Sequence, residues 1–439
     1  MLNAEKEIKK WAPVLEHADA APITDRYKKA VTAKLLENTE KAIREENAHS
    51  SYSLNEGLGT DTSSGNMPGQ GTGFDPILIS LVRRAMPNLI AYDVAGVQPM
   101  SGPTGLIFAM EPRHESNSTA GITSADAAAF APGVEPGDVA GAGTGTNTGN
   151  TGAFNSDVTT DASAEAIFDA DNIGFNVEDS EDANIAGEMG FTLSKTVVEA
   201  KTRQLKAEYT MEMAQDLKAV HGLDAEAELA NILSGEILGE INREIIRTII
   251  KQAKLGVTGV QNTAKLDLSA SNDSIGRWAV EKYQYLAFAI EKEANKIAEE
   301  TRRGKGNFVI CSSNVASALA GAGKLTFGGD GSLNVDSTGN TFAGVLNGSL
   351  KVYVDPYAVG DYAVVGYKGD SAYDAGIFYC PYVPLTMIKA VGENTFQPKI
   401  AFKTRYGIAT NPFVTASGGA AGNTSNLNQY YRKFGVVGI

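Results

Sequence analysis

The chain has 439 residues, of which 43% are hydrophobic and 21% charged, and it carries a net charge of -14. Such a chain can bury a sizeable core, with enough length for about two or three domains. No apolar run approaches the roughly 18 residues that cross a bilayer, and MLNAEKEIKKWAPVLEH at the start lacks the apolar core and cleavage site of a secretory signal. We therefore expect no membrane span and a protein that matures in a cytoplasm.

The negative charge is concentrated in one segment. Residues 111–190 contain 15 acidic residues and one basic residue, Arg113, so this segment alone accounts for the whole net charge of -14. Affinity for DNA phosphates comes mostly from Lys and Arg, which release counterions on binding. A chain without a basic excess is therefore a poor candidate for gripping DNA phosphates, and if nucleic acid is nearby we expect the protein to enclose it rather than to read its sequence.

The first half of the chain alternates helical and loop-like stretches. Residues 1 to about 50 have apolar positions at helical intervals, and the Gly, Ser and Thr of 57–73 predict an extended arm. The stretch 74–110 begins with a short helix candidate, turns at SGPTG and continues as the strand LIFAM. The acidic segment 111–190 is low in complexity, and 193–209 is ambiguous between helix and strand.

The second half predicts two long helices followed by strands. Asp224 is a good N-cap, and Leu229, Leu233, Ile237, Ile241 and later isoleucines lie on one face of a helix over 224–254. A second helix covers 275–303. After residue 305 short apolar runs such as NFVICSS, LKVYVDP and AGIFYCPYVPL predict strands. Helices first and strands later favour the α+β class.

No residue pattern predicts catalysis, a cofactor or a metal. The histidines lack ligand spacing, and we interpret Cys311 and Cys380, which are far apart in apolar contexts, as reduced core thiols. Asp169 and Asp171 lack the rest of a calcium loop. Three arginines could bind a carboxylate or phosphate, although ordinary ion pairs are the simpler interpretation; they are Arg83, Arg84 and Arg405. The sequence therefore predicts no enzyme.

Several stretches, spread in order over nearly the whole chain, resemble the major capsid proteins of T4-like tailed phages. They are LVRRAMPNLIAYDVAGVQPMSGPTG (81–105), KAEYTMEMAQDLKAVHGLDAEAEL (206–229), EINREI (240–245), FAGVLNG (342–348), VGYKGDSAYDAGIFYCPYVPL (365–385), FKTRYGIATNPF (402–413) and the terminal VVGI. The resemblance implies the HK97-like fold, which has an N-terminal arm, an E-loop, a spine helix, a P-domain and an A-domain. It also implies that the ambiguous stretch 193–209 is a strand, namely the return strand of the E-loop.

The resemblance implies the following organisation. Residues 1–56 are a propeptide removed on maturation, 57–100 the arm (57–85) and the start of the shell domain, 101–210 the E-loop with the acidic insertion, 211–304 the spine helix and P-domain, 305–395 the A-domain, and 396–439 C-terminal strands that return to the P-domain. The family's insertion domain would fall in 111–190, but this segment is short and low in complexity, which argues against a well-folded insertion.

The resemblance also implies a processing site, because the prohead protease of such phages cuts after Glu in Leu-x-Glu or Ile-x-Glu. Leu54-Asn55-Glu56, followed by Gly57, fits this pattern, and so does Leu35-Leu36-Glu37. A protease needs an extended substrate, and Leu35 lies in a helical pattern whereas Leu54 borders the Gly/Ser-rich arm. We therefore predict cleavage between Glu56 and Gly57.

The implied function is self-assembly into hexameric capsomers of a phage head that encloses double-stranded DNA. The implied partners are further copies of the chain, the vertex protein, a scaffold core protein, the prohead protease, the portal and decoration proteins, and the protein would end in the virion after assembly in the host cytoplasm. Two alternatives stay open at this point. One is the pentamer-forming vertex protein, a paralogue with the same fold, and the other is an acidic hydrolase or carbohydrate binder that uses 111–190.

Overall fold

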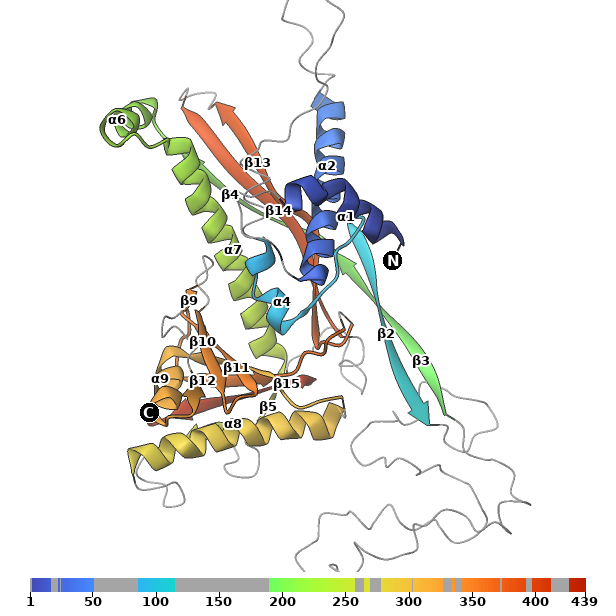
Figure 1. Cartoon of the computed structure of the whole chain (residues 1–439), viewed down its shortest axis with the longest axis vertical. Helices are drawn as coiled ribbons and strands as arrows, with labels where there is room; N and C mark the ends of the chain where they lie inside the picture. The colour runs from blue at the N-terminus through green and yellow to red at the C-terminus, as the bar shows by residue number, and fades with distance from the viewer. Residues whose placement is uncertain are drawn as a thin grey trace, which may run out of the picture. The chain divides into compact units, whose positions relative to one another are not determined.

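The computed structural model describes residues 2–16, 23, 25–50, 86–114, 189–256, 264–268, 278–301, 303–326, 334–335, 341–371, 373–391, 397–411 and 426–439 (Figure 1). The chain divides into two compact units. The larger unit comprises Met1–Ile107, Thr196–Ile297 and Lys305–Ile439, and the smaller comprises Phe108–Lys195 and Ala298–Gly304. The strands β2 (Thr104–His114) and β3 (Met189–Glu199) form a separate two-stranded sheet. The features below belong to the larger unit, except for the outer parts of these two strands and the last residues of the helix that ends at Thr301.

A four-stranded sheet forms one half of the larger unit. Its strands run in the order β1 (Gly96–Val97), β13 (Ile377–Val391), β14 (Pro398–Thr410) and β4 (Lys201–Glu208), with β1 parallel to β13 and the other neighbours antiparallel. Side chains alternate between its faces. Tyr379 and Phe402 belong to one hydrophobic core, whereas Phe378 and Cys380 belong to another. We name these the helix side and the hairpin side of the sheet.

Helices share the core on the helix side. These are α2 (Arg26–Ser50), α4 (Ala91–Val94) and the 28-residue α7 (Ala225–Gln252), the long green helix of Figure 1. The first turn of α7 is capped by Asp224, whose side chain accepts a hydrogen bond from the Glu226 amide. A shorter helix, α1 (Leu2–Leu15), pairs with α2, and η1 (Met86–Asn88) precedes α4.

The hairpin side carries the inner ends of β2 and β3, where Ile107 and Val198 are buried with Phe378 and Cys380. The strand β3 approaches β14 closely at Gly407. A Cβ atom at this glycine would lie 2.4 Å from Val198 Cγ1, so only glycine permits the contact.

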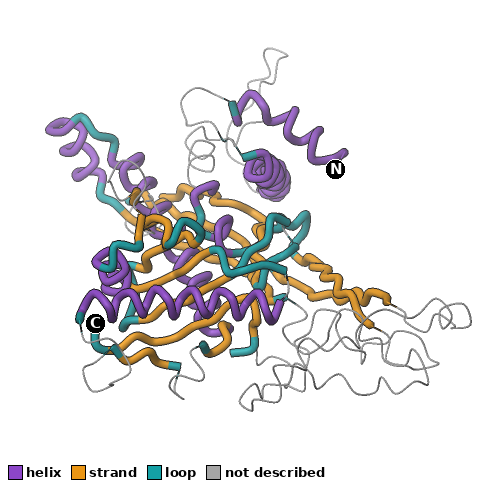
Figure 2. Tube along the Cα trace, turned by 60° about the horizontal axis from the view of Figure 1, so that its bottom comes forward, coloured by secondary structure: helices purple, strands orange, loops and turns teal. Residues whose placement is uncertain are grey.

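A nine-stranded sheet forms the other half of the larger unit. Its order is β5-β15-β12-β7-β11-β10-β8, with β6 beside β15 and β9 beside β10. The bounds are β5 Ala253–Leu255, β6 Lys265–Asp267, β7 Phe308–Ser312, β8 Leu325–Thr326, β9 Asn334–Val335, β10 Thr341–Leu346, β11 Leu350–Asp355, β12 Tyr362–Gly366 and β15 Asn428–Val437. Strand β7 is buried along its whole length, as expected for a continuous apolar run covered on both faces. One of these faces is covered by α8 (Ala279–Thr301) and α9 (Ser313–Gly321), and Figure 2 shows α8 lying along the strands.

The structure confirms the α+β class, the long helix after Asp224, the second long helix and the strand assignment of 193–209. Helices α6 (Met211–His221) and α9 were not predicted, the latter because the region after residue 305 was expected to form strands only. Thr210 caps α6 by accepting a hydrogen bond from the Met213 amide, and Gly222 ends it with a φ of 67°. Both are recognisable helix-boundary residues.

The predicted domain boundaries stay a prediction, and sheet membership does not follow chain order. Strand β13 falls in the predicted A-domain segment but pairs with β14 and β1, while β15 follows β14 in the chain and joins the sheet of β12 and β7. Helix α8, grouped in sequence with α7, shares its core with the nine-stranded sheet.

Candidate functional site

The predicted processing residues Leu54, Glu56 and Gly57 lie outside the described residues. The competing motif, Leu35-Leu36-Glu37, lies within α2. Leu35 and Leu36 are each 1% exposed, so the helical prediction for this segment is confirmed and its two leucines are packed in the core. A protease cannot extend this substrate without first detaching and unfolding the helix.

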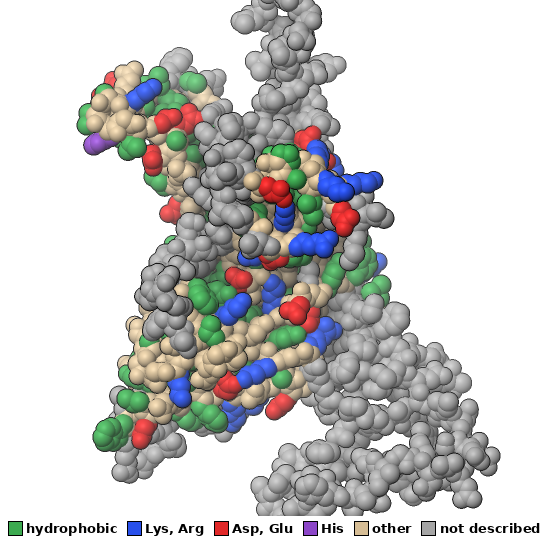
Figure 3. Space-filling view, viewed as in Figure 1, with side chains coloured by type: hydrophobic (Ala, Val, Ile, Leu, Met, Phe, Trp, Pro, Cys, Tyr) green, Lys and Arg blue, Asp and Glu red, His purple; other side chains and the backbone are tan. Residues whose placement is uncertain are grey.

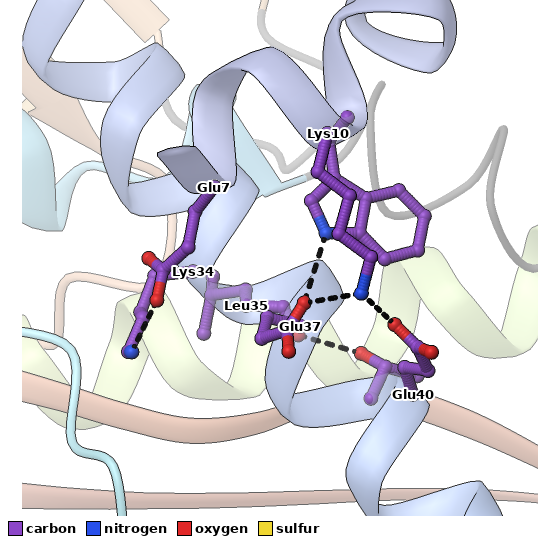
Figure 4. Close-up of polar contacts among 8 residues, drawn as sticks. Glu7, Lys10, Lys34, Leu35, Glu37 and Glu40 are labelled. Atoms are coloured by element: carbon purple, nitrogen blue, oxygen red, sulfur yellow. Dashed lines mark hydrogen bonds and ion pairs between the residues drawn. The ribbon is translucent and has the colours of Figure 1, made fainter. Parts of the chain in front are cut away.

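Ion pairs join α1 to α2 (Figure 4). Lys10 of α1 lies 2.8 Å from a carboxylate oxygen of Glu37 and also pairs with Glu40, while Lys34 of α2 lies 2.7 Å from Glu7. The hydrogen bond from Lys10 lowers the pKa of Glu37, and the bonds to Glu37 and Glu40 raise the pKa of Lys10. On the face drawn in Figure 3, acidic and basic side chains gather over these helices. Because these side chains remain 19–50% exposed, each ion pair adds little stability, and the main contribution of the pairs is to fix the pairing of the two helices.

Polar contacts tie α2 to the rest of the larger unit. Asn38 is 3% exposed, and its Nδ2 donates to the Met100 carbonyl at 2.7 Å and to the Tyr382 carbonyl at 2.9 Å. The Tyr27 hydroxyl donates to the Val97 carbonyl. Removing the buried amide of Asn38 would leave two carbonyls without their donor, at a cost of about 1–3 kcal/mol. The chain before the predicted cleavage site is therefore a docked element of the fold.

Lys28 adds two more contacts next to these. Its Nζ lies 5.4 Å from the ring centroid of Tyr92 in α4 and donates to the Pro87 carbonyl at 3.3 Å. A cation over an aromatic face contributes about 0.5–2 kcal/mol. Helix α2 is thus held both at β13 and at the segment that leads into β1.

A second feature is an open groove between α7 and β4, with a volume of about 480 Å³. Arg203 of β4 donates to Glu240, to Glu244 at 2.6 Å and to the Tyr406 hydroxyl at 2.9 Å. Tyr406 in turn donates to Glu244. Burial, followed by the Glu244 contact, raises the pKa of Tyr406, which keeps this hydroxyl a donor. The same groove is lined by Arg243, Arg247 and Lys251.

The remaining sequence candidates form no reactive cluster in the described part of the chain. Cys311 and Cys380 are free and buried, as predicted, and burial raises the pKa of each thiol to about 12. The guanidinium of Arg405 lies 5.3 Å from the ring centroid of Tyr382 and forms no ion pair with the residues that the structure describes, while Arg83 and Arg84 lie outside those residues.

Asp169, Asp171 and His17 also fall outside the described residues, and His221 is exposed at the end of α6. Among the residues that are described, no group of three or more His, Cys, Asp or Glu could hold a metal, and no helix is both long and apolar enough to span a membrane. Instead, the described residues form ion pairs that join α1 to α2 and hydrogen bonds that dock α2 on the rest of the larger unit.

Comparison with known proteins gives one consistent family. The model of the family described as "Major capsid protein Gp23" matches residues 72–436. The chain is 37% identical to the major capsid protein of Vibrio phage KVP40 (98% of this chain, 99% of the relative) and 39% identical to that of Salmonella phage ViI (98% of each). It is 36% identical to that of Enterobacteria phage T4 over 98% of each chain.

Similarity to a capsid vertex protein is more limited. The vertex protein of Enterobacteria phage T4 is 30% identical over 54% of this chain and 56% of that protein. Among solved structures, the capsid of the Myoviridae phage XM1 aligns with 80% of this chain and 92% of that chain, at 8% identity and a TM-score of 0.38.

Proposed function

The chain belongs to the family of Gp23 major capsid proteins, and from this premise we propose that its copies assemble into the hexameric capsomers of a phage head. Members of this family are structural proteins of the virion capsid, so the chain is a capsid component and not an enzyme. This excludes the hydrolase alternative. The observation that carries the hexameric role is similarity to major capsid proteins over 98% of the chain.

The vertex protein is the weaker alternative, because its similarity covers only about half of the chain at lower identity. Cryo-electron microscopy of heads that contain this chain distinguishes the two roles. We expect the fold of the larger unit in density at the hexameric positions of the lattice. Density for this chain at the fivefold vertices alone would contradict the proposal.

The element order fits the HK97-like fold expected for the family. In this scheme β2 and β3 with the acidic segment form the E-loop, α7 is the spine helix, and the nine-stranded sheet with α9 forms most of the A-domain. The shell would enclose double-stranded DNA without reading its sequence, because the chain has a net charge of -14. Its further partners would be the vertex protein, the portal and decoration proteins.

Maturation by proteolysis is the second part of the proposal. The prohead protease would cut between Glu56 and Gly57, within Leu54-Asn55-Glu56-Gly57, and release residues 1–56 from the subunit. The burial of Leu35 and Leu36 in α2 supports this choice over the motif that ends at Glu37. Before cleavage, α1 and α2 would contact the scaffold core.

The released segment carries 9 basic and 10 acidic residues, so its loss barely changes the charge of the shell. Its effect would be mechanical instead. The contacts of Tyr27, Lys28 and Asn38 hold β13 and the segment 87–100 together in the precursor. Their removal would loosen this junction, which the pairing of β1 with β13 still holds, and we expect this loosening to favour expansion of the head.

A further inference from the structure

Three basic residues form a stripe along one side of α7. Arg243, Arg247 and Lys251 follow one another at intervals of four residues within the helix. At 1.5 Å per residue, this places three cations on one side of α7 over about 12 Å. All three line the open groove beside β4, and the side chains of Arg247 and Lys251 are exposed.

The acidic residues of the groove do not cancel this stripe. Glu240 and Glu244 are both bound by Arg203 of β4. The guanidinium of Arg243 lies 5.1 Å from the ring centroid of Tyr357. Within the described part of the chain, Arg247 and Lys251 have no carboxylate at ion-pair distance. The groove therefore has a local excess of positive charge on a protein whose net charge is strongly negative.

The position of the groove indicates which way it faces in a shell. Helices α2 and α7 share the core on the helix side of the four-stranded sheet, whereas the inner ends of β2 and β3, which lead to the acidic segment, pack on the hairpin side. If α1 and α2 contact a scaffold core, the helix side faces the interior. None of the groove's residues comes from 1–56, so the groove outlasts removal of that segment.

We propose that the stripe of Arg243, Arg247 and Lys251 contacts phosphates of the double-stranded DNA inside the shell. This rests on the proposed function, because the interior orientation follows from it. A stripe of about 12 Å spans roughly three to four phosphates of one strand. Such a contact does not depend on the DNA sequence and is weak for a single subunit. Because it is repeated on every subunit of the inner wall, it offsets the repulsion between DNA and an acidic protein.

Salt-dependent binding of a 30-base-pair DNA duplex to the purified full-length chain tests the proposal. Three phosphate contacts predict a slope of about -2.7 for the logarithm of the binding constant against the logarithm of the salt concentration. The double variant Arg247→Gln/Lys251→Gln should reduce the slope to about -0.9, and at ~20 mM salt it should weaken binding about 10³-fold. Lys201→Gln/Lys218→Gln removes the same charge outside the groove and should leave the slope unchanged. Equal effects of the two double variants, or a wild-type slope near zero, would overturn the proposal.

Formaldehyde cross-linking of DNA-filled heads provides a readout in the assembled particle. We expect DNA attached at Lys251, identified by mass spectrometry after nuclease digestion. If Lys251 is instead cross-linked to residues 111–190 of another subunit, the groove binds an acidic protein segment and the proposal is wrong. If the chain is missing from the hexamers of the heads, the proposed function fails, whatever the duplex titration shows.

Discussion

Weaker packing of α2 on the core should expose the protease motif Leu35-Leu36-Glu37. Val31 is 3% exposed and belongs to the core on the helix side. Val31→Ala deletes two methyl groups, each worth about 0.8 kcal/mol, and leaves a small cavity, so we expect detachment of α2 to become easier by about 2 kcal/mol. Since 1.4 kcal/mol is a factor of ten, the detached population should rise about 30-fold.

Limited proteolysis of the uncleaved chain with a Glu-specific protease measures this population. When detachment is fast relative to cleavage, the rate of cutting between Glu37 and Asn38 follows the detached fraction. Mass spectrometry of this one bond should therefore show cleavage about 30-fold faster in Val31→Ala. The matched control is Arg26→Ala, whose side chain is 85% exposed and pairs with Glu5 only at 3.4 Å, and it should change the rate less than about twofold. A Val31→Ala rate within twofold of the wild type, or equal acceleration in both variants, would refute the docking argument.

Three further predictions concern the stability of the shell subunit. Gly366→Ala places a Cβ atom 2.3 Å from a ring carbon of Phe308 and should lower the free energy of unfolding, measured by urea titration, by about 1–3 kcal/mol. Its control, Gly235→Ala, adds a methyl group in open space within α7 and should raise the free energy of unfolding by about 0.5–1 kcal/mol. Glu293→Ala removes the carboxylate that lies 3.1 Å from a guanidinium nitrogen of the buried Arg432 and should cost about 3–5 kcal/mol; a loss below 1 kcal/mol would contradict this buried ion pair. Burial raises the pKa of the Cys311 and Cys380 thiols to about 12, whereas thiols in the unfolded chain ionise near pH 8.5. The stability that the two buried thiols contribute is therefore complete below about pH 8.5 and is lost as the pH rises towards 12. Iodoacetamide at pH 8 should label both thiols only after unfolding, and labelling of the native chain would show that they are accessible.

Local signals in the sequence identified most of the elements. Helix α7 was predictable because its apolar period and the Asp224 cap agree, and β7 because a short apolar run suits a strand covered on both faces. How these elements pair with one another was harder to predict from the sequence. Strand β15 joins β12, and α8 packs on the nine-stranded sheet, through contacts between segments that are distant in the chain.

The docking of α2 illustrates the same difficulty at the candidate site. The helix itself follows from its periodicity, but Asn38 finds one of its acceptors 344 residues away, on Tyr382. Nothing local in the sequence marks this asparagine as buried. The α7 groove was not predicted either, because Arg203, which bridges Glu240 and Glu244, comes from another element of the fold.

The most direct test of the central claim is the N-terminal sequence of the subunit in mature, DNA-filled heads. A shell subunit that is processed after assembly should begin Gly-Leu-Gly at Gly57, with Glu56 as the last residue of the released segment. A subunit that still begins at Met1 would contradict processing. A new end at Asn38 would show that α2 detaches before cleavage and that the docked helix does not protect its motif.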